Sequence, residues 1–464
     1  MRGAIAAGHP VTAEVGARVL AEGGNAVDAA VAAGFASWIA ESPLTGPGGG
    51  GFMLVHRARD RSTRVLDFFV TVPTGGVDIE AMETVGVPFD TKTTQLFLVG
   101  TAAAAVPGAA AGLEHAHGRF GSLPWRDLVA PAIDLARDGV EVTPTQAYLH
   151  EILVAIIGPR PAAGERLRFV DLAATLERIA DEGTAFLSTG DVARALCEIA
   201  PQITPEDLAG YRVITRRPVT ATFRAHEFAS NPPPSSGGVL IAYGLQLLER
   251  GGSFEPADLI ETMRGQNAVR DRLFHSQLYR GGLARRLVDA PSMTTHISVV
   301  DAQGNAASLS CSTGSGSGTV IPGTGLSLNN MLGERDLAGL HRPGSRLTSM
   351  MAPSICFGGG SPRLVLGSAG SARLRGAIMQ VIVNLLAQGM NVHDAVDAPR
   401  VHLEDEVVHA ERGIDARGLG YGQVTQWKER NLFFGGVNAV EVLADGTLAA
   451  AGDVRRGGAA VVVE

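Results

Sequence analysis

The stretch Met-Thr-Thr-His-Ile-Ser-Val-Val-Asp-Ala-Gln-Gly-Asn, residues 293–305, places two threonines directly before an alternating strand in the middle of the chain. Threonine pairs before β-branched residues are ordinary strand composition, so a structural role is the simpler interpretation of the pair taken alone. A threonine hydroxyl is a weak nucleophile at neutral pH, but a threonine that begins a chain can pass its proton to its own α-amine. The alternative hypothesis is a nucleophile created by cutting the chain before Thr294.

Composition limits the classes of protein to which the chain can belong. Its 464 residues, 45% hydrophobic and 19% charged, can bury a large core and would ordinarily suggest two or three domains. A formal net charge of -8, with scattered lysines and arginines, leaves no basic patch for nucleic acid. The three cysteines, Cys197, Cys311 and Cys356, have no CxxC spacing, so they predict neither a disulfide framework nor a zinc site. They favour a reducing compartment, and we expect no metal and no cofactor.

The apolar segments predict no membrane span. The longest run of small apolar residues, 98–113, contains Pro107 and several glycines and is too short to cross a bilayer. We interpret it as the start of a buried helix. The first residues lack the uninterrupted apolar region of a signal peptide, so we expect a cytoplasmic protein without a membrane partner.

Hydrophobic periodicity predicts a helical first half and strands around Thr294. Helices are expected over 10–41 with a break at 23–25, and over 112–119, 125–137, 239–249 and 374–387. Strands are expected over 52–57, 66–72, 219–223, 296–300, 306–310, 326–329, 354–357 and 364–366. Residues 42–51, with four consecutive glycines but no P-loop Lys-Ser/Thr, predict a closely packed loop beside the active site rather than a phosphate site. The pattern favours an α+β fold of two stacked, mostly antiparallel sheets enclosed by helices.

Further segments accompany the threonine pair, at residues 3–10, 23–30, 231–238, 346–350, 367–373, 398–400 and 452–458. In this order they resemble the gamma-glutamyltranspeptidase family of N-terminal nucleophile hydrolases. The resemblance covers nearly the whole chain and is weakest between about 140 and 225. It implies one large domain, a four-layer αββα sandwich, that cuts itself between Met293 and Thr294. Residues 1–293 and 294–464 would stay together as a heterodimer, and a higher oligomer is left open.

The resemblance also implies roles in acyl transfer. In the uncut chain the Thr294 hydroxyl would attack the Met293 carbonyl, and water would hydrolyse the resulting ester. The same hydroxyl would then form an acyl-enzyme with a small-molecule substrate, which is hydrolysed or transferred. Gly370 and Ser371 match the paired glycines whose amides hold the oxyanion, with serine in place of the second glycine. Ser312 matches a threonine that supports the nucleophile.

The positions that would bind a γ-glutamyl group depart from the family. The arginine that clamps the α-carboxylate after an Asp-Phe pair is replaced by Phe69. Two positions that hold the α-amine are Gly314 and Met331, and only Glu334 keeps acidic character. Because a hydrogen bond to a charged group is worth about 1.5 to 3 kcal/mol, glutathione is not the expected substrate.

Other side chains could bind a different anionic group. Thr348 and Ser349 match the family's hydroxyl pair that contacts the substrate carboxylate. A shortened segment before them carries Arg342 and Arg346, and Arg373 follows the glycine turn. We expect one of these arginines to hold an acidic or α-oxo acyl group.

Four alternatives stay open. Members of the superfamily cleave cephalosporin side-chain amides, split oxamate, or hydrolyse a carbon-carbon bond to release an oxalyl fragment during alkylproline antibiotic assembly. The chain could also be an uncleaved, non-catalytic binding homologue.

His296, close to the nucleophile, invites a triad interpretation, but an N-terminal threonine carries its own base and a structural role is favoured.

Overall fold

Two antiparallel sheets form the centre of the protein. The structure is a computed structural model that describes residues 2–88, 94–270, 294–334, 342–404 and 406–464. The first sheet has the order β22 (Ala459–Val463), β1 (Gly3–Ala7), β11 (Thr295–Asp301), β12 (Ala306–Ser312), β2 (Gly50–Arg57), β3 (Ser62–Phe68) and β8 (Ile214–Arg216). The second has the order β21 (Leu448–Ala451), β20 (Gly436–Val442), β16 (Ser361–Ala369), β15 (Ser354–Gly358), β10 (His226–Ser230) and β9 (Val219–Phe223).

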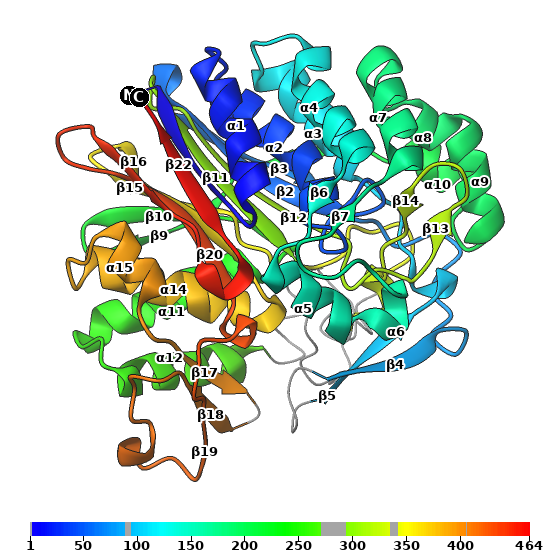
Figure 1. Ribbon diagram of the computed structural model, residues 1–464. Helices are drawn as coiled ribbons and strands as arrows, with labels where there is room; N and C mark the ends of the chain where they lie inside the picture. Colours follow the sequence, from blue (N-terminus) through cyan, green and yellow to red (C-terminus); the bar gives the residue numbers. More distant parts are fainter. Residues whose placement is uncertain (1, 89–93, 271–293, 335–341, 405) are drawn as a thin grey trace.

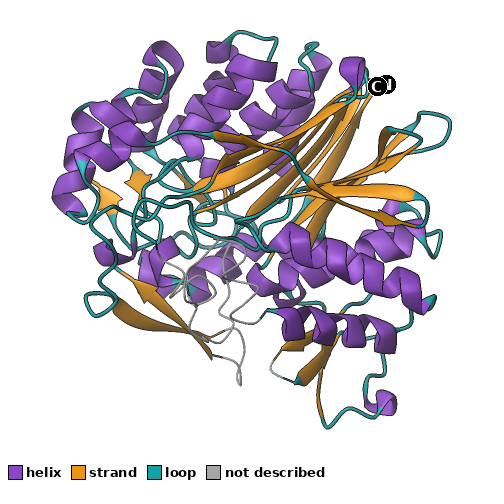
Figure 2. Ribbon diagram, turned by 180° about the vertical axis from the view of Figure 1, so that it is seen from behind, coloured by secondary structure: helices purple, strands orange, loops and turns teal. Residues whose placement is uncertain are grey.

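Helices cover the outer face of each sheet (Figures 1 and 2). Over the first sheet lie α1 (Pro10–Ala21), α2 (Ala26–Ala40) and α3 (Ala109–Phe120), with α4 (Trp125–Asp138) behind α2. On the second sheet lie α11 (Gly237–Gly251) and α14 (Leu374–Leu386), with α12 (Pro256–Val269) packed on α11. The two sheets face each other between these helical layers.

Alternation along the strands of the two central sheets divides their apolar side chains among three cores. In β16, Val365 packs between the sheets, whereas Leu364 and Leu366 pack against the helices of the second sheet. In β1, Ala6 faces the space between the sheets and Ile5 faces the helices of the first sheet. Because successive side chains of a strand point to opposite faces, a strand buried on both sides is apolar throughout. The α+β class that the sequence predicts is therefore confirmed.

Local hydrogen bonds explain the predicted break between the first two helices. Asn25 caps α2, with its side chain accepting from the amides of Val27 and Asp28, while the Asp28 carboxylate accepts from the Asn25 amide. The same carboxylate accepts from the Ser122 hydroxyl at 2.5 Å and thereby joins α2 to the end of α3. These bonds satisfy amides that a helix terminus leaves open.

Three predicted elements differ from the structure. The strand expected over 66–72 ends at Phe68, because the Phe69 amide donates to the Asp67 carboxylate and the Thr71 and Val72 amides donate to carbonyls outside the sheet. The strand expected over 326–329 covers only Leu326–Ser327, since the Asn329 side chain is taken up by backbone groups of other segments. Residues 98–113 begin a helix only in their last part: they include the end of β5 (Thr94–Val99) and the short helix η2 (Thr101–Ala103), and α3 starts at Ala109. None of the described helices is long and apolar enough to cross a membrane.

Candidate active site

Thr294 immediately precedes the central strand β11 and is completely buried. Its hydroxyl has no hydrogen-bond partner among the described residues. Thr295 lies opposite Cys311 on β12, so the register continued by one residue places Ser312 opposite Thr294. Met293, the other side of the predicted cleavage site, lies outside the described residues. The structure therefore places the predicted nucleophile and Ser312 at the same end of two paired strands.

A tight turn after Ser312 lies next to a second predicted site residue, Glu334. Its hydroxyl accepts from the amide of Gly314 at 2.8 Å. Gly314 has a left-handed φ of 71°, and a Cβ there would collide with Asn330 and come within 2.7 Å of a Glu334 carboxylate oxygen. The turn thus brings Glu334 towards the same strand end, and only glycine fits between them.

The Gly370–Ser371 turn lies at the same end of the sandwich. β16 crosses β11 and β12, where the Ser308 hydroxyl donates to the carbonyl of Leu366 at 3.1 Å and the His296 ring packs against Gly367. The residues that follow β16 therefore continue towards the end where β11 begins. Gly370 and Ser371 have φ values of 126° and 58°, directly before α14. Successive amides in such a turn, at a helix N-terminus, form a concavity suited to an anion.

His296 belongs to a buried network of serines between the sheets. Its Nδ1 lies 2.8 Å from the Ser310 hydroxyl and its Nε2 lies 2.9 Å from the Ser298 hydroxyl. Burial lowers the pKa of His296 to about 3, so the ring is neutral at physiological pH. Both ring nitrogens are used, which supports the structural interpretation of this histidine.

A buried glutamate beside the threonine pair was not found from the sequence. The side chain of Thr295 points away from the sheet interface and donates to the carboxylate of Glu41, which also accepts from the Thr12 hydroxyl at 2.8 Å. A Cβ on Gly8 would collide with this carboxylate. Burial raises the pKa of Glu41 to about 7, against the opposing effect of the two hydroxyls. No local pattern marks Glu41, which directly follows α2 and is 254 residues from Thr295 in the chain.

The predicted hydroxyl pair joins two of the recognised segments. The Thr348 hydroxyl donates to the carbonyl of Pro234 at 2.8 Å. The Ser349 hydroxyl accepts from the Met351 amide at 3.0 Å, and its carbonyl accepts from the Ser236 amide at 2.9 Å. Both side chains are buried. Segments 231–238 and 346–350 therefore lie side by side.

Phe69 and Arg346 lie together but neither is exposed. Phe69 stacks on Phe52 between the sheets, with ring centroids 5.3 Å apart. The Arg346 guanidinium donates to the carbonyl of Phe69, pairs with Asp67 at 3.3 Å and lies 4.7 Å from the Tyr211 ring centroid. Its Nη1 and Nη2 thus donate hydrogen bonds within the protein, and its Nε faces the Asp67 carboxylate. This geometry favours a structural role for Arg346, and the substrate contact that the sequence suggested stays a prediction.

The other two predicted arginines differ in their surroundings. Arg373 is buried after the Gly370–Ser371 turn, 3.3 Å from a Glu404 carboxylate oxygen and 4.4 Å from the Phe433 ring centroid. Arg342 is only partly buried and lies in a turn, in which its backbone carbonyl accepts from the Ser345 amide. Of the three arginines, only Arg373 adjoins the predicted oxyanion turn.

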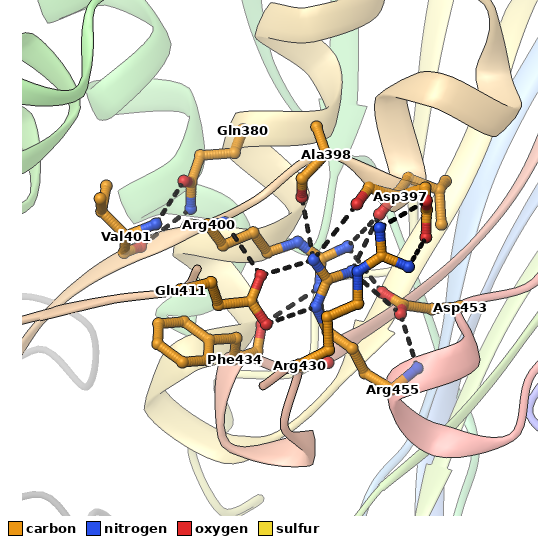
Figure 3. Close-up of polar contacts among 12 residues, drawn as sticks. Gln380, Asp397, Ala398, Arg400, Val401, Glu411, Arg430, Phe434, Asp453 and Arg455 are labelled. Carbon is orange, nitrogen blue, oxygen red and sulfur yellow. Dashed lines mark hydrogen bonds and ion pairs between the residues drawn. The ribbon is translucent and has the colours of Figure 1, made fainter. Parts of the chain in front are cut away.

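Figure 3 shows a buried cluster of ion pairs that unites the last two recognised segments. Arg400 pairs with Asp453 at 2.6 Å, and Arg455 pairs with Glu411 at 2.5 Å and with Asp453 at 3.2 Å. Removing one member would leave a buried charge without its partner, which costs about 3 to 5 kcal/mol. These residues hold the fold around the site.

Comparison with known proteins gives consistent results. The model of the family described as Gamma-glutamyltranspeptidase matches residues 12–278 and 266–463. The chain is 32% identical to an Acylase ACY 1 proenzyme from Pseudomonas sp. (strain SE83), covering 100% of this chain and 94% of that protein. It is 31% identical to the Glutathione hydrolase proenzyme of Escherichia coli (strain K12), covering 98% and 90%. The crystal structure of cephalosporin acylase from Bacillus halodurans shares the fold, with a TM-score of 0.84 at 23% identity, covering 100% of this chain and 96% of that one.

Proposed function

Because the chain belongs to the gamma-glutamyltranspeptidase family, we propose that it is a self-processing hydrolase whose nucleophile is the Thr294 hydroxyl. One observation carries the proposal: this hydroxyl is buried directly before β11 and has no hydrogen-bond partner among the described residues. A buried hydroxyl without a partner costs free energy, and such a cost persists in proteins where function uses the group. In the uncut chain the hydroxyl attacks the Met293 carbonyl, and the amide nitrogen leaves with a proton as the new α-amine. Water then hydrolyses the ester.

The second half of the proposal is the acyl transfer itself. The α-amine of Thr294 takes the hydroxyl proton as the oxygen attacks the substrate carbonyl, and the leaving amine takes that proton when the carbon-nitrogen bond breaks. The backbone amides of Gly370 and Ser371 would hold the tetrahedral oxyanion. Each such donor contributes about 2.7 to 4 kcal/mol to the transition state. Water or an acceptor amine then releases the acyl group.

We propose an amide substrate with an acidic or α-oxo acyl group, other than glutathione. Phe69 offers no charge for an α-carboxylate, and Arg346 is already bonded to Asp67. Arg373, Arg342 and the hydroxyls of Thr348 and Ser349 stay candidates for the substrate contact. The acylases among the relatives favour amide cleavage. Release of an oxalyl-type fragment by carbon-carbon cleavage in antibiotic assembly is the alternative reaction at the same site.

Denaturing electrophoresis with intact-mass measurement tests the self-processing step. The wild-type chain should give fragments of 293 and 171 residues, and Thr294→Ala should stay at 464 residues. Thr294→Ser is the matched control, because it keeps both a hydroxyl and an α-amine and should still be cut. A wild-type enzyme that turns over substrate as a single chain would contradict the mechanism.

A second assay tests the proposed specificity. Wild-type protein should be almost inert towards γ-glutamyl-p-nitroanilide and should not transfer its acyl group to glycylglycine. Glutaryl-p-nitroanilide, which has the same length but lacks the α-amine, is the matched comparison. Vigorous transpeptidation from the γ-glutamyl compound would show that Phe69 has not changed the pocket.

One observation favours a non-catalytic homologue as the second candidate. Ser371 stands where the family has glycine, and its φ of 58° is unfavourable for a residue with a Cβ. A binding protein would be found by mass as a single uncut chain with affinity for a small molecule. The same measurement that tests self-processing therefore separates the two candidates.

The assembly and the compartment are also proposals. Because the first sheet takes strands from both sides of residue 294, the two fragments would stay interleaved as a heterodimer. Cys197, Cys311 and Cys356 are all free thiols, which supports the cytoplasm as the site of action. Fractionation of cells and gel filtration of the cut protein would test these two points.

A further inference from the structure

Arg456 lies directly against the Gly370–Ser371 turn, although 86 residues separate it from Gly370 in the chain. It ends the short helix η7 (Val454–Arg456) and is 9% exposed. Its Nη2 lies 3.3 Å from the position that a Cβ on Gly370 would take, and donates to the carbonyl of Leu432 at 3.1 Å. The guanidinium thus occupies the space beside the turn that a side chain at residue 370 would need.

Arg456 forms no ion pair with a carboxylate of the described residues. Within the part of the chain that the structure describes, its Nε and Nη1 are buried without a hydrogen-bond partner, and no carboxylate lies within 4.0 Å of the guanidinium. Its neighbours Arg400 and Arg455 are both paired with carboxylates, as Figure 3 shows for the adjoining cluster. Burial, together with the positive charge of Arg373, lowers the pKa of Arg456 to about 9, and Asp453 opposes this.

A buried cation without a counter-ion is unfavourable in the resting protein. The same cation becomes favourable when negative charge develops nearby, since a fixed charge acts strongly where water is excluded. An interaction that is stronger in the transition state than in the ground state accelerates the reaction. Arg456 lies beside the turn where the oxyanion of the proposed reaction would form.

We propose that Arg456 is a positioning residue for acyl transfer, which fixes the Gly370–Ser371 turn and supplies positive charge behind its amides. The inference rests on the proposed function, because it requires that this turn holds the oxyanion. It assigns Arg456 a role that differs from that of a substrate ligand. A role through the turn affects the chemical step for every acyl group, whereas a ligand role affects only substrates with a matching anion.

Two substitutions separate charge from packing. Arg456→Met removes the charge and keeps an unbranched apolar side chain, whereas Arg456→Lys keeps the charge. Arg430→Met is the matched control, because Arg430 belongs to the same region, pairs with Asp397 and is about half exposed. All variants should still be cut before Thr294, and their thermal melting curves would establish that they fold.

The probe is p-nitrophenyl acetate, an activated ester without a carboxylate, with Thr294→Ala as the blank. We expect Arg456→Met to lower kcat by about 10- to 100-fold with KM changed less than about twofold. This loss is smaller than the roughly 100- to 1000-fold loss for a direct oxyanion donor, because Arg456 acts through the turn. Arg456→Lys should recover kcat to within about fivefold of wild type, and Arg430→Met should match wild type. This split would not follow from a purely structural role.

Three results would overturn the inference. Wild-type kcat in Arg456→Met would show that the charge is not used. Equal losses in Arg456→Met and Arg456→Lys would show that only the exact packing of arginine matters. A rise in KM confined to glutaryl-p-nitroanilide would identify a substrate-carboxylate contact instead. The proposed function fails separately, if Thr294→Ala releases p-nitrophenolate as fast as wild type.

Discussion

Replacing the buried carboxyl of Glu41 by an amide should make the protein more stable at neutral and alkaline pH. In the folded chain Glu41 is 4% exposed and contacts two threonine hydroxyls, Thr12 and Thr295. Burial raises its pKa from the usual 4.5 to about 7. Glu41→Gln keeps the size and the hydrogen-bonding capacity of the side chain, and removes the ionisation.

The sign and size of the effect follow from proton linkage. Because the pKa is raised in the folded state, the contribution of Glu41 is fully present below pH 4.5 and is lost as the pH rises through about 7. At about 1.4 kcal/mol for each tenfold change in proton affinity, the rise from 4.5 to about 7 corresponds to about 3 kcal/mol. Glu41→Gln should therefore equal its parent near pH 4.5 and exceed it by about 3 kcal/mol at pH 8.

Urea unfolding followed by tryptophan fluorescence at several pH values between 4.5 and 8 would measure this difference. Both proteins should carry Thr294→Ala, so that an uncut chain unfolds in each case. Glu14→Gln, an exposed position on α1, is the matched control and should show no pH-dependent difference from its parent. If the stability curves of Glu41→Gln and its parent run parallel from pH 4.5 to 8, Glu41 is ionised in the folded protein and the reasoning fails.

Three further changes test other parts of the site. Ser371→Gly should stabilise the fold by up to about 1 kcal/mol and leave self-cleavage intact, because glycine tolerates the φ of 58°. A lower melting temperature than that of wild type would contradict this expectation. Arg346→Met should lower the free energy of unfolding, measured in urea, by about 3 kcal/mol, because the buried Asp67 carboxylate would keep only Arg216 as an ion-pair partner. An unchanged urea midpoint of unfolding would argue against a structural role for Arg346. The His296 imidazole should show no NMR titration between pH 5 and 8, because its pKa is lowered to about 3 in the folded protein. The unfolded chain takes up a proton at this ring below pH 6.5, so the folded protein loses stability only as the pH falls below that value.

The sequence predicted those helices and strands whose formation depends on residues close together in the chain. The break before α2 depends on Asn25 and Asp28, which lie within four residues of each other, and the alternation of β11 and β12 is visible in the sequence. The sequence did not predict β1, a run of small buried residues that is as apolar on one face as on the other. A strand buried on both faces has no alternation, so its pattern resembles that of a core helix.

For the candidate site, too, local sequence patterns were more informative than residues whose partners are distant in the chain. Gly370, Ser371, Thr348 and Ser349 were assigned from segments that occur in the order typical of the family, and their roles stay predictions. The surroundings of charged residues were harder to predict, because they depend on partners that are distant in sequence. Arg346 was expected at the substrate, but Asp67, more than 270 residues earlier, takes its guanidinium.

Arg456 and Glu41 were missed for this reason as well. The contact of Arg456 with Gly370 and that of Glu41 with Thr295 arise only when the chain has folded. Both side chains are buried, yet nothing in their immediate sequence distinguishes them from arginines and glutamates at the surface. Burial of a charge is a property of the tertiary structure, and it reveals functional candidates only once the neighbours are known.

Strand β1 gives the proposed cleavage a kinetic consequence. It lies between β11 and β22, with Gly3 opposite both Asp301 and Val463, so its two neighbours both come from beyond residue 294. In the uncut chain these strands meet as parts of one molecule, and their encounter rate does not depend on protein concentration. After cutting, the same pairing requires two molecules to collide, and refolding from denaturant becomes second order. The precursor is then the species that folds efficiently, and the mature enzyme, once unfolded in dilute solution, would recover slowly.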